Sequence, residues 1–572
     1  MAEAVAGGAI LTGAAPHPRR MSLSEAAVAR LLILLLVALL LGIIALPLAS
    51  LLSKSVEDGS GAFVGLRNFA TYFSTPTLVA SLFNSVAVAA LATAIVVPLA
   101  FTYAYALTRS RMRLKGLFYA AALLPVFAPS LLAAISLTYI FGNQGFLRGA
   151  LFGNSIYGPI GIVIAEILYA LPHALVINVA ALALADGRLY EAAEALGTRP
   201  ARVFRTVTLP GARYGLISSA FVVFTLVVTD FGIPKVIGGQ FNVLATDAYK
   251  QVVGQQNFPM GAVVGIVLLA PAILAFLVER TVQRRQVALL SARAVPLEPK
   301  RRPLADSLLT VFCGLVAGTV IGTYGVAVWA SFITYWPYNL TPTLANYDFE
   351  RFEPSGWDPY WTSLKMAALT ALLGTGLVFT GAYLIEKTKQ FGAGRFFAQF
   401  LAMLPMAVPG LVIGLGYVFF FNAPSNPLNW LYGTLAILVI NSVAHFYTVA
   451  HMTATTALKN LDGEFEAVSA SLKIPFWVTF ARVTVPISMP AILDIAVYLF
   501  VNGMTTVSAV IFLYGAETKL ASVAIVHMDE AGTTSAAAAM ASAIVLTAIG
   551  AKLAQLGLSR FVFARLQRWR VR

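Results

Sequence analysis

Long apolar runs recur along this chain, and they restrict its fold more than any other feature. A helix that spans a bilayer core needs about 20 predominantly apolar residues, and residues 31–52 alone supply that length. Of the 572 residues, 59% are hydrophobic and 11% are charged, whereas a soluble domain carries about 25% charged residues. A transmembrane barrel would show short alternating segments instead. The sequence therefore predicts an all-α polytopic membrane protein.

Hydropathy places about twelve spans along the chain. They lie near residues 30–53, 80–108, 117–141, 156–184, 213–233, 259–279, 306–333, 363–385, 396–421, 430–456, 487–514 and 532–556. The first run is longer than the apolar core of a signal peptide, which has about 7–15 residues. We therefore expect a retained first helix rather than a cleaved leader.

A basic, proline-containing stretch between the sixth and seventh spans divides the chain. The expected organisation is a disordered cytoplasmic N-terminus (1–29), a first permease-like half (30–280), a cytoplasmic linker (281–305), a second half (306–557) and a basic cytoplasmic tail (558–572).

The two halves resemble each other at a shift of about 276–280 residues. GLRNFATYF matches TLANYDFERF, LLPVFAP (123–129) matches MLPMAVP (403–409), and the pairs Asn68/Asn346, Asp186/Asp462, Phe204/Phe480 and Pro210/Pro486 align. Both halves hold the same even number of spans, so the repeats run parallel. Such halves are expected to be related by a pseudo-two-fold axis along the membrane normal, with any pathway at their interface.

Positive charge gathers in a few short loops. The net charge is +14, and most of the Lys and Arg lie in residues 109–116, 186–210, 279–302 and 386–395 and in the tail. Such loops face the cytoplasm, so both termini are expected there. Contact with membrane lipid explains this basicity, and nucleic-acid binding is not expected because no basic module with interleaved aromatics occurs. A single cysteine, Cys313, excludes an intramolecular disulfide and a thiolate metal site.

A polar segment between two spans, LYEAAEALGTRPARVFRTVTLP (189–210), predicts two short helices joined at an angle. Asp186 can cap the first helix, and Gly197 can end it in a left-handed conformation. Thr198 can cap the second helix, with Pro200 in its first turn. The same pattern recurs between residues 462 and 486, so a simple connecting loop is a weaker explanation.

The spacing EAA-x-x-x-G, followed by Phe204 and Leu209-Pro210, resembles the cytoplasmic EAA loop of permease subunits of binding-protein-dependent ABC importers. The doubled arrangement resembles the fused two-domain permeases that serve ferric iron, thiamine and 2-aminoethylphosphonate, and the likeness covers nearly the whole chain. In that family the loop docks in a groove of the ATPase subunit. The resemblance implies this role for Glu191, Ala192, Ala193, Gly197 and Phe204.

The second copy departs from the pattern. Its glutamate is displaced to Glu466, with Ala467 at the position of Glu191, and Lys473 stands in place of the glycine. A non-glycine residue in a left-handed conformation costs roughly 1 kcal/mol or more, so a differently shaped turn is expected. The corresponding ATPase-coupling residues are Glu466, Ala470 and Phe480.

The sequence holds no G-x-x-x-x-G-K-[ST] phosphate loop, so we expect no ATPase site, no catalytic residue and no cofactor of its own. The resemblance implies ATPase subunits as partners, in two copies, which bind ATP. It also implies a periplasmic or lipid-anchored solute-binding protein, and hence a bacterial inner membrane.

Ionisable groups within spans are costly and mark candidate pathways. Asp230 and its aligned partner Thr506 are the preferred pair, and Glu166 and Asp494 are further candidates. For each of them an interhelical hydrogen bond is the simpler alternative. His173 and His445 also lie in spans, but the five histidines show no metal-ligand spacing.

Two alternatives remain at this stage. A self-contained secondary transporter would also suit twelve spans in two halves, but it has no use for doubled EAA-type hairpins. For the cargo, KLASVAIVHMDEAG (519–532) is more similar to the 2-aminoethylphosphonate-type members. Ferric iron is the alternative cargo within the same family.

Overall fold

The computed structural model describes residues 23–183, 185–289 and 297–566. Within them the chain forms helices, apart from one antiparallel hairpin in which Ile333 pairs with Pro342 and Tyr335 with Asn339. The elements of the first half are α1 (Leu23–Leu40), η1 (Leu41–Ala45), α2 (Leu46–Ser55), α3 (Arg67–Ser74), α4 (Pro76–Arg109), α5 (Lys115–Ala122), η2 (Leu124–Phe127), α6 (Ser130–Phe141), η3 (Arg148–Leu151), α7 (Pro159–Ala183), α8 (Gly187–Ala195), α9 (Pro200–Val203), η4 (Phe204–Thr208), α10 (Leu209–Thr229), α11 (Gly232–Ile237), α12 (Leu244–Tyr249), η5 (Lys250–Gly254) and α13 (Phe258–Leu289).

The second half repeats this order. Its elements are α14 (Pro303–Ser331), β1 (Ile333–Tyr335), β2 (Asn339–Pro342), η6 (Ala345–Tyr347), η7 (Phe349–Arg351), α15 (Asp358–Glu386), α16 (Gly392–Met403), η8 (Leu404–Ala407), α17 (Gly410–Phe421), η9 (Asn429–Leu431), α18 (Leu435–Lys459), α19 (Glu464–Ser471), α20 (Phe476–Thr479), η10 (Phe480–Thr484), α21 (Val485–Ile487), α22 (Met489–Thr505), α23 (Ala521–Glu530) and α24 (Thr534–Leu566). Helices α15, α18, α22 and α24 stand where α4, α7, α10 and α13 stand in the first half.

The all-α membrane fold is confirmed. Among the described residues, nine helices are long and apolar enough to cross a membrane, or up to eleven if each of two bent pairs is one span. This revises the expected count of about twelve, because the predicted spans at 117–141 and 396–421 are not single helices.

Two prolines break each of these spans. In the first half the break separates α5 from α6, and in the second it separates α16 from α17 with a bend of 114°. The residues before Pro129 and Pro409 are extended, at ψ 142° and 119°, because a proline ring excludes the helical conformation from the residue before it. The conserved-looking LP-x-x-x-P pattern in both halves therefore encodes a repeated break.

The predicted span 487–514 is also shorter than expected, since α22 ends at Thr505. It is bent by 78° from the helical segment Phe476–Ile487, whereas Pro200–Thr229 continues as one helix in the first half. The second half has an extra proline, Pro490, four residues after Pro486. Its ring clashes with the carbonyl of Pro486 and it donates no hydrogen bond, so the helix breaks between them.

The boundaries of the two halves differ from the sequence expectation at three places. Helix α1 already begins at Leu23, α13 continues to Leu289 in the expected linker, and α24 continues to Leu566 in the expected tail. The remaining parts of those predictions, residues 1–22, 290–296 and 567–572, lie outside the described residues.

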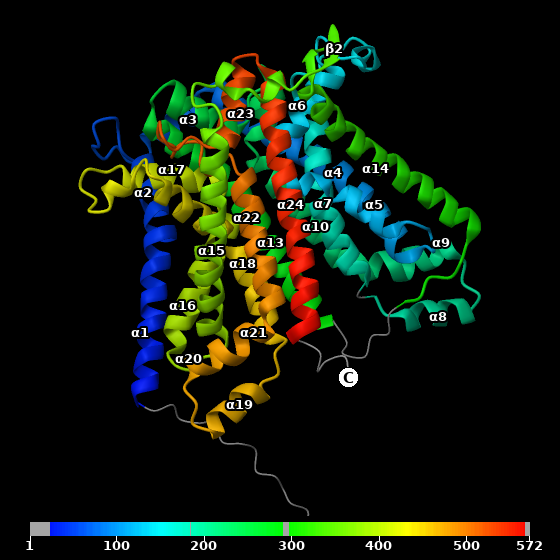
Figure 1. The fold of residues 1–572 in the computed structure, drawn as a ribbon, viewed down its shortest axis with the longest axis vertical. Helices are drawn as coiled ribbons and strands as arrows, with labels where there is room; N and C mark the ends of the chain where they lie inside the picture. The colour runs from blue at the N-terminus through cyan, green and yellow to red at the C-terminus, as the bar shows by residue number, and fades with distance from the viewer. Residues whose placement is uncertain (1–22, 184, 290–296, 567–572) are drawn as a thin grey trace, which may run out of the picture.

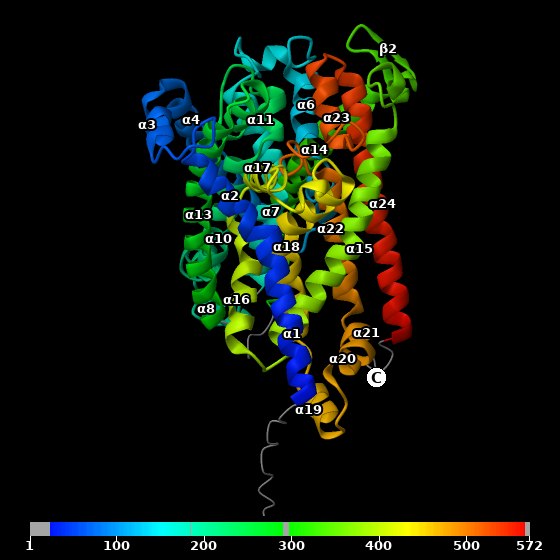
Figure 2. The same cartoon turned by 90° about the vertical axis from the view of Figure 1, so that its left-hand side faces the viewer.

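The first helices of the two halves are exchanged. Helices α1 and α2 pack against α16 and α17 of the second half, and α14 packs against α5 and α6 of the first. Figures 1 and 2 show these two arms on opposite sides of the molecule. A hydrogen bond links one of these arms to the other half: the hydroxyl of Tyr417 in α17 donates to the backbone oxygen of Ile43, between α1 and α2, at 2.6 Å. The halves are therefore interlocked rather than merely adjacent.

The aligned asparagines show that the sequence repeat is a structural repeat. Asn68 donates its side-chain amide to the backbone oxygens of Ser55 and Glu57, at 2.9 and 2.7 Å. Asn346 donates in the same way to Ser331 and Ile333, at 3.1 and 2.7 Å. Each asparagine thus satisfies carbonyls at the end of its first helix, which would otherwise lack partners.

Candidate functional site

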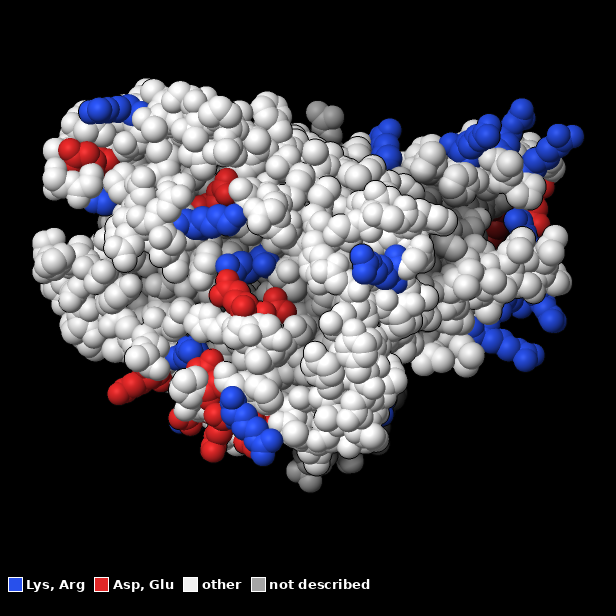
Figure 3. Space-filling model, turned by 90° about the horizontal axis from the view of Figure 1, so that it is seen from above, with Lys and Arg blue, Asp and Glu red and all other residues white. Residues whose placement is uncertain are grey.

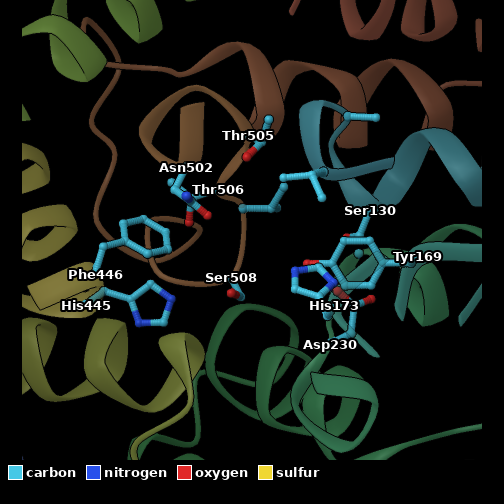
Figure 4. A pocket seen from close by; sticks show the side chains of 14 residues that line it. Ser130, Tyr169, His173, Asp230, His445, Phe446, Asn502, Thr505, Thr506 and Ser508 are labelled. Atoms are coloured by element: carbon cyan, nitrogen blue, oxygen red, sulfur yellow. The ribbon is translucent and has the colours of Figure 1, made fainter. Parts of the chain in front are cut away.

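A cavity of about 120 Å³ lies where the two halves meet. Seven of its lining residues come from each half, and Figure 4 shows the two sets facing each other across the space. The lining residues are Val126, Ala128, Ser130, Tyr169, His173, Asp230 and Gly232 on one side and His445, Phe446, Asn502, Thr505, Thr506, Val507 and Ser508 on the other. This position agrees with the pathway predicted at the interface.

Asp230 and Thr506 occupy equivalent positions in the cavity wall. Each is the residue that ends its helix, at φ −68°, ψ 135° in α10 and φ −66°, ψ 136° in α22. Asp230 accepts a hydrogen bond of 2.8 Å from the backbone of Ile233 and so caps α11. The backbone oxygen of Thr506 accepts from Ser522 at 2.6 Å. The structure thus brings this predicted pair together in one cavity.

Two further pairs in the wall are related by the same shift of 276 residues. Tyr169 on α7 corresponds to His445 on α18, and Gly232 corresponds to Ser508. His173 lies one turn from Tyr169, with ring centroids 5.8 Å apart. Apart from Thr506, the sequence alone pointed to neither Tyr169 nor the serines and threonines of the wall. Extending the repeat alignment from Asp230 into the helix pair α7/α18 would have found Tyr169.

The other two predicted path residues do not line this cavity. Glu166 is fully buried on α7, and neither carboxylate oxygen has a hydrogen-bond partner among the described residues. Asp494 lies near the start of α22, where Gln555 of α24 donates to it at 2.8 Å and Lys552 lies 3.9 Å away. For Asp494 the structure favours the simpler alternative, a contact between helices.

The turns that join α8 to α9 and α19 to α20 have the same shape. Gly197 has φ +66° and Lys473 has φ +54°. In both turns the next residue donates five positions back, Thr198 to Ala193 at 3.0 Å and Ile474 to Ser469 at 2.9 Å. The expectation of a differently shaped second turn is therefore wrong. The hydrogen bonds hold Lys473 in the left-handed region despite its side chain.

The capping of the hairpin helices agrees with the sequence prediction only in part. Asp186 and Asp462 both accept from a backbone N–H two residues on, at 3.1 Å. Thr198, however, does not cap the second helix, because α9 begins at Pro200 with Arg199 in the capping position and without a side-chain cap. The fixed φ of Pro200 sets the direction of α9 without help from Thr198.

Phe204 and Phe480 hold the hairpins to the membrane helices. Phe204 packs on Phe101 and Tyr105 of α4, with ring centroids 6.2 and 5.8 Å apart. Phe480 packs on Phe379 and Tyr383 of α15, at 6.0 and 4.7 Å. Both rings are half-buried. They point into their own half, so these two residues anchor the hairpin instead of forming its outer surface.

Each hairpin is also fastened by a cation at the C-terminal end of a long helix, α4 in the first half and α15 in the second. Arg109 donates to the backbone oxygen of Leu182 at 2.7 Å, and its guanidinium lies 5.0 Å from the ring centroid of Tyr190. Lys387, the aligned residue, forms an ion pair of 2.9 Å with Glu466. Because Glu466 aligns with Tyr190, the ion pair of the second half takes the place of the cation–π contact of the first. Glu466 faces inward and does not take the position of Glu191.

The outward faces of the hairpins are apolar with a few charges. In the first, Glu191, Ala192 and Gly197 are exposed and Ala193 is half-buried, beside Leu189 and Leu196, which are 58% and 83% exposed. In the second, the half-buried Ala470 lies beside Val468, Leu472 and Trp477, which are 57%, 66% and 43% exposed. Apolar side chains exposed on polar hairpins are typical of a surface that another protein covers.

The comparisons with known proteins agree with this geometry. Residues 96–287 match the family model described as the inner membrane component of binding-protein-dependent transport systems. A putative ferric transport system permease protein of Haemophilus influenzae is 30% identical over 414 residues, which is 70% of this chain and 64% of the relative. Residues 96–287 therefore hold a domain of this permease family.

Other members of the permease family are more distant. A putative 2-aminoethylphosphonate transport system permease protein of Salmonella typhi is 26% identical over 39% of this chain and 80% of the relative. A thiamine transport system permease protein of Brucella suis is 24% identical over 69% of this chain and 71% of the relative. The chain spans less than two thirds of the length of two ferric relatives, 64% of the one from Haemophilus influenzae that is 30% identical and 63% of one from Actinobacillus pleuropneumoniae.

No metal-binding group of three or more His, Cys, Asp or Glu side chains occurs within the described residues. In the cavity, Asp230 is accompanied by His173 and His445 from opposite walls. The site therefore offers dispersed oxygen and nitrogen donors and hydroxyl groups, which suits the transient contacts of a passage more than tight retention of an ion.

Proposed function

We propose that this chain is the membrane-spanning permease of an importer that receives a solute from a binding protein and is driven by separate ATPase subunits. The observation that carries the proposal is the cavity built by seven residues of each half, in a molecule with a matched hairpin in each half. A passage between two halves that rock against each other requires such a site at their interface.

The hairpins are the proposed ATPase docking elements, one for each of two ATPase copies. Their outward residues are Glu191, Ala192 and Ala193 in the first and Ala470 in the second, with Gly197 shaping the turn. Both hairpins, the start of α1 and the end of α24 lie at the same end of the molecule (Figures 1 and 2). This supports the orientation inferred from the basic loops, with both termini cytoplasmic in a bacterial inner membrane and the binding protein on the opposite side.

For the cargo we propose a cation, with ferric iron favoured over 2-aminoethylphosphonate. The cavity holds one carboxylate, Asp230, and two imidazoles, and none of its lining residues is Lys or Arg. A phosphonate group is recognised best by cationic donors, and neither Lys nor Arg lines this wall. Ferric permeases among the relatives support the same choice. Residues 519–532, which resemble the phosphonate-type permeases, are not among the residues that line this cavity.

Uptake of radiolabelled ferric iron and of radiolabelled 2-aminoethylphosphonate tests the proposal, in proteoliposomes that hold the chain with its ATPase and binding protein. Asp230→Asn should abolish iron uptake, while Asp494→Asn, outside the cavity, should keep it. Uptake should require ATP and persist after collapse of the proton gradient. Phosphonate uptake without iron uptake would refute the cargo. Uptake driven by the proton gradient alone would favour a secondary transporter.

A further inference from the structure

Five basic residues gather where α5 and α14 begin, beside the first hairpin. They are Arg111, Arg113, Lys115, Arg301 and Arg302, and we call them the junction cluster. Asp306 holds their backbones together, since its two carboxylate oxygens accept from the backbone N–H of Arg111 at 3.2 Å and of Arg302 at 3.1 Å. The hydrogen bond between Arg111 and Asp306 thus joins two segments that lie 195 residues apart in sequence, one from each half of the molecule.

Asp306 lies near the junction cluster, and its charge acts on Lys115. Arg111, Arg113, Arg301 and Arg302 are exposed, and Lys115 is half-buried. Within the described part of the chain none of the five forms an ion pair with a carboxylate. Five cations against Asp306 leave a net charge of +4 by count. Figure 3 shows Lys and Arg side chains that project at the right-hand side of the molecule, where α9 and the start of α14 lie in Figure 1.

Exposed leucines adjoin the junction cluster. Leu114 and Leu117, at the start of α5, are 65% and 60% exposed, and Leu304 and Leu308, at the start of α14, are 76% and 64% exposed. The two helices pack on each other, and only 17% of the apolar window of α14 is buried in the protein. The basic group therefore lies at the end of an apolar surface that faces the acyl chains of the bilayer.

We propose that the junction cluster binds the headgroup of an anionic phospholipid, whose acyl chains lie along Leu117 and Leu308. Arginine is suited to this contact because its planar group forms paired hydrogen bonds to phosphate oxygens. Basic groups between membrane helices on the cytoplasmic side attract anionic headgroups. The apolar surface distinguishes a lipid from a free phosphate ion, which would gain nothing from the leucines.

In the second half, the described loop that matches residues 109–116 does not repeat this arrangement. In the matching loop, residues 386–395, Lys387 is paired with Glu466, and Arg395 donates to the backbone oxygen of Ile385 at 2.6 Å. Lys389, which aligns with Arg111, is the exposed cation that remains in that loop. Among the residues that the structure describes, the arrangement occurs at the junction cluster, which bridges α5 of the first half and α14 of the second. Its occupation would stabilise the exchanged arm.

Thermal unfolding of the full-length protein in a neutral detergent, with and without added phosphatidylglycerol, tests the site. We expect a clear rise in Tm for the wild-type protein and at least about tenfold weaker lipid binding for Arg111→Gln/Arg113→Gln/Arg301→Gln. The matched control is Lys389→Gln/Lys459→Gln, which removes exposed cations from the same side of the second half. Native mass spectrometry would count the lipid retained by each variant.

Three results would overturn the proposal. A triple variant that retains phosphatidylglycerol would show that the lipid binds elsewhere. Equal loss in the control would reduce the effect to general surface charge. An equal rise in Tm with inorganic phosphate or glycerophosphate would show that the acyl chains make no contact. None of these outcomes depends on which cargo the protein transports.

Discussion

The hairpin of the first half (residues 186–210) and that of the second half (residues 462–486) end their first helices in the same left-handed turn. Both carry a phenylalanine that packs on a long helix of the same half, α4 in the first and α15 in the second. They differ in the fastening contact, which is Arg109 over Tyr190 in one and Lys387 with Glu466 in the other. The turn and the aromatic anchor therefore fix the shape, while the cation accepts either an aromatic ring or a carboxylate.

The connection to the membrane differs as well. The first hairpin continues into α10 as one helix, whereas a bend of 78° separates the second hairpin from α22. A rigid helix transmits a displacement of its end directly, and a broken one can absorb part of it. The two hairpins have the same local build but need not move the two cavity walls equally.

Removal of the aromatic anchors should have the largest effect on this comparison. Fully buried Phe→Ala substitutions cost about 3–5 kcal/mol; for these half-buried rings we expect about 2–3 kcal/mol for Phe204→Ala and for Phe480→Ala alike. Both variants should lose bound ATPase in a co-purification assay, and Phe204→Leu should keep most of it. Loss in one half only would show that the two anchors are not equivalent.

The fastening contacts should come next. The Lys387 side chain is only 12% exposed, and in Glu466→Gln it would lose its charged partner. We therefore expect this variant to lose about 1–2 kcal/mol of folding stability. The double variant Lys387→Arg/Glu466→Tyr rebuilds the first-half contact in the second half and should recover most of this loss. Protease sensitivity of residues 460–475 would report both. A double variant weaker than Glu466→Gln would show that the two contacts are not interchangeable.

The turn residues should matter less. Gly197→Lys places a side chain at φ +66°, where nothing lies within 4 Å of the new Cβ, so the expected cost is the conformational one of about 1–2 kcal/mol. Lys473→Gly relieves a similar strain but adds about 0.5–1 kcal/mol of entropy cost, and its net effect should be near zero. Measuring the rate of ATP-driven uptake for the Gly197→Lys and Lys473→Gly variants would test both expectations. Complete loss of ATPase binding in Gly197→Lys would show that the partner subunit closely contacts this turn.

The smallest effect is expected at the linker. Lys300 and Glu194 form an ion pair of 2.5 Å, with side chains 69% and 55% exposed. Exposed pairs contribute about 0–1 kcal/mol, so Lys300→Gln should leave uptake and Tm almost unchanged. A large loss would reveal that the linker restrains the first hairpin, which has no parallel in the second.

Local patterns explain what the sequence by itself determined. Runs of about 20 apolar residues fix the membrane fold, and the repeat fixes the correspondence between the halves. The positions of the hairpins and of their capping aspartates follow from residue types within a few positions of each other, and the pair Asp230/Thr506 follows from the repeat. The paired prolines also stood in the sequence, but hydropathy merges their breaks into single spans because it averages over a window.

The tertiary structure alone decided which surfaces meet. Lipid tails are as apolar as leucine, so hydrophobicity gives a membrane helix no preference for one neighbour over another. The exchange of α1 and α14, the pairing of Glu466 with Lys387 and the position of Asp494 against α24 all depend on packing between distant segments. The same holds for the cavity, where Tyr169 and His445 face each other from opposite halves. Close packing and the satisfaction of buried polar groups select these contacts, and neither is visible in a single segment of sequence.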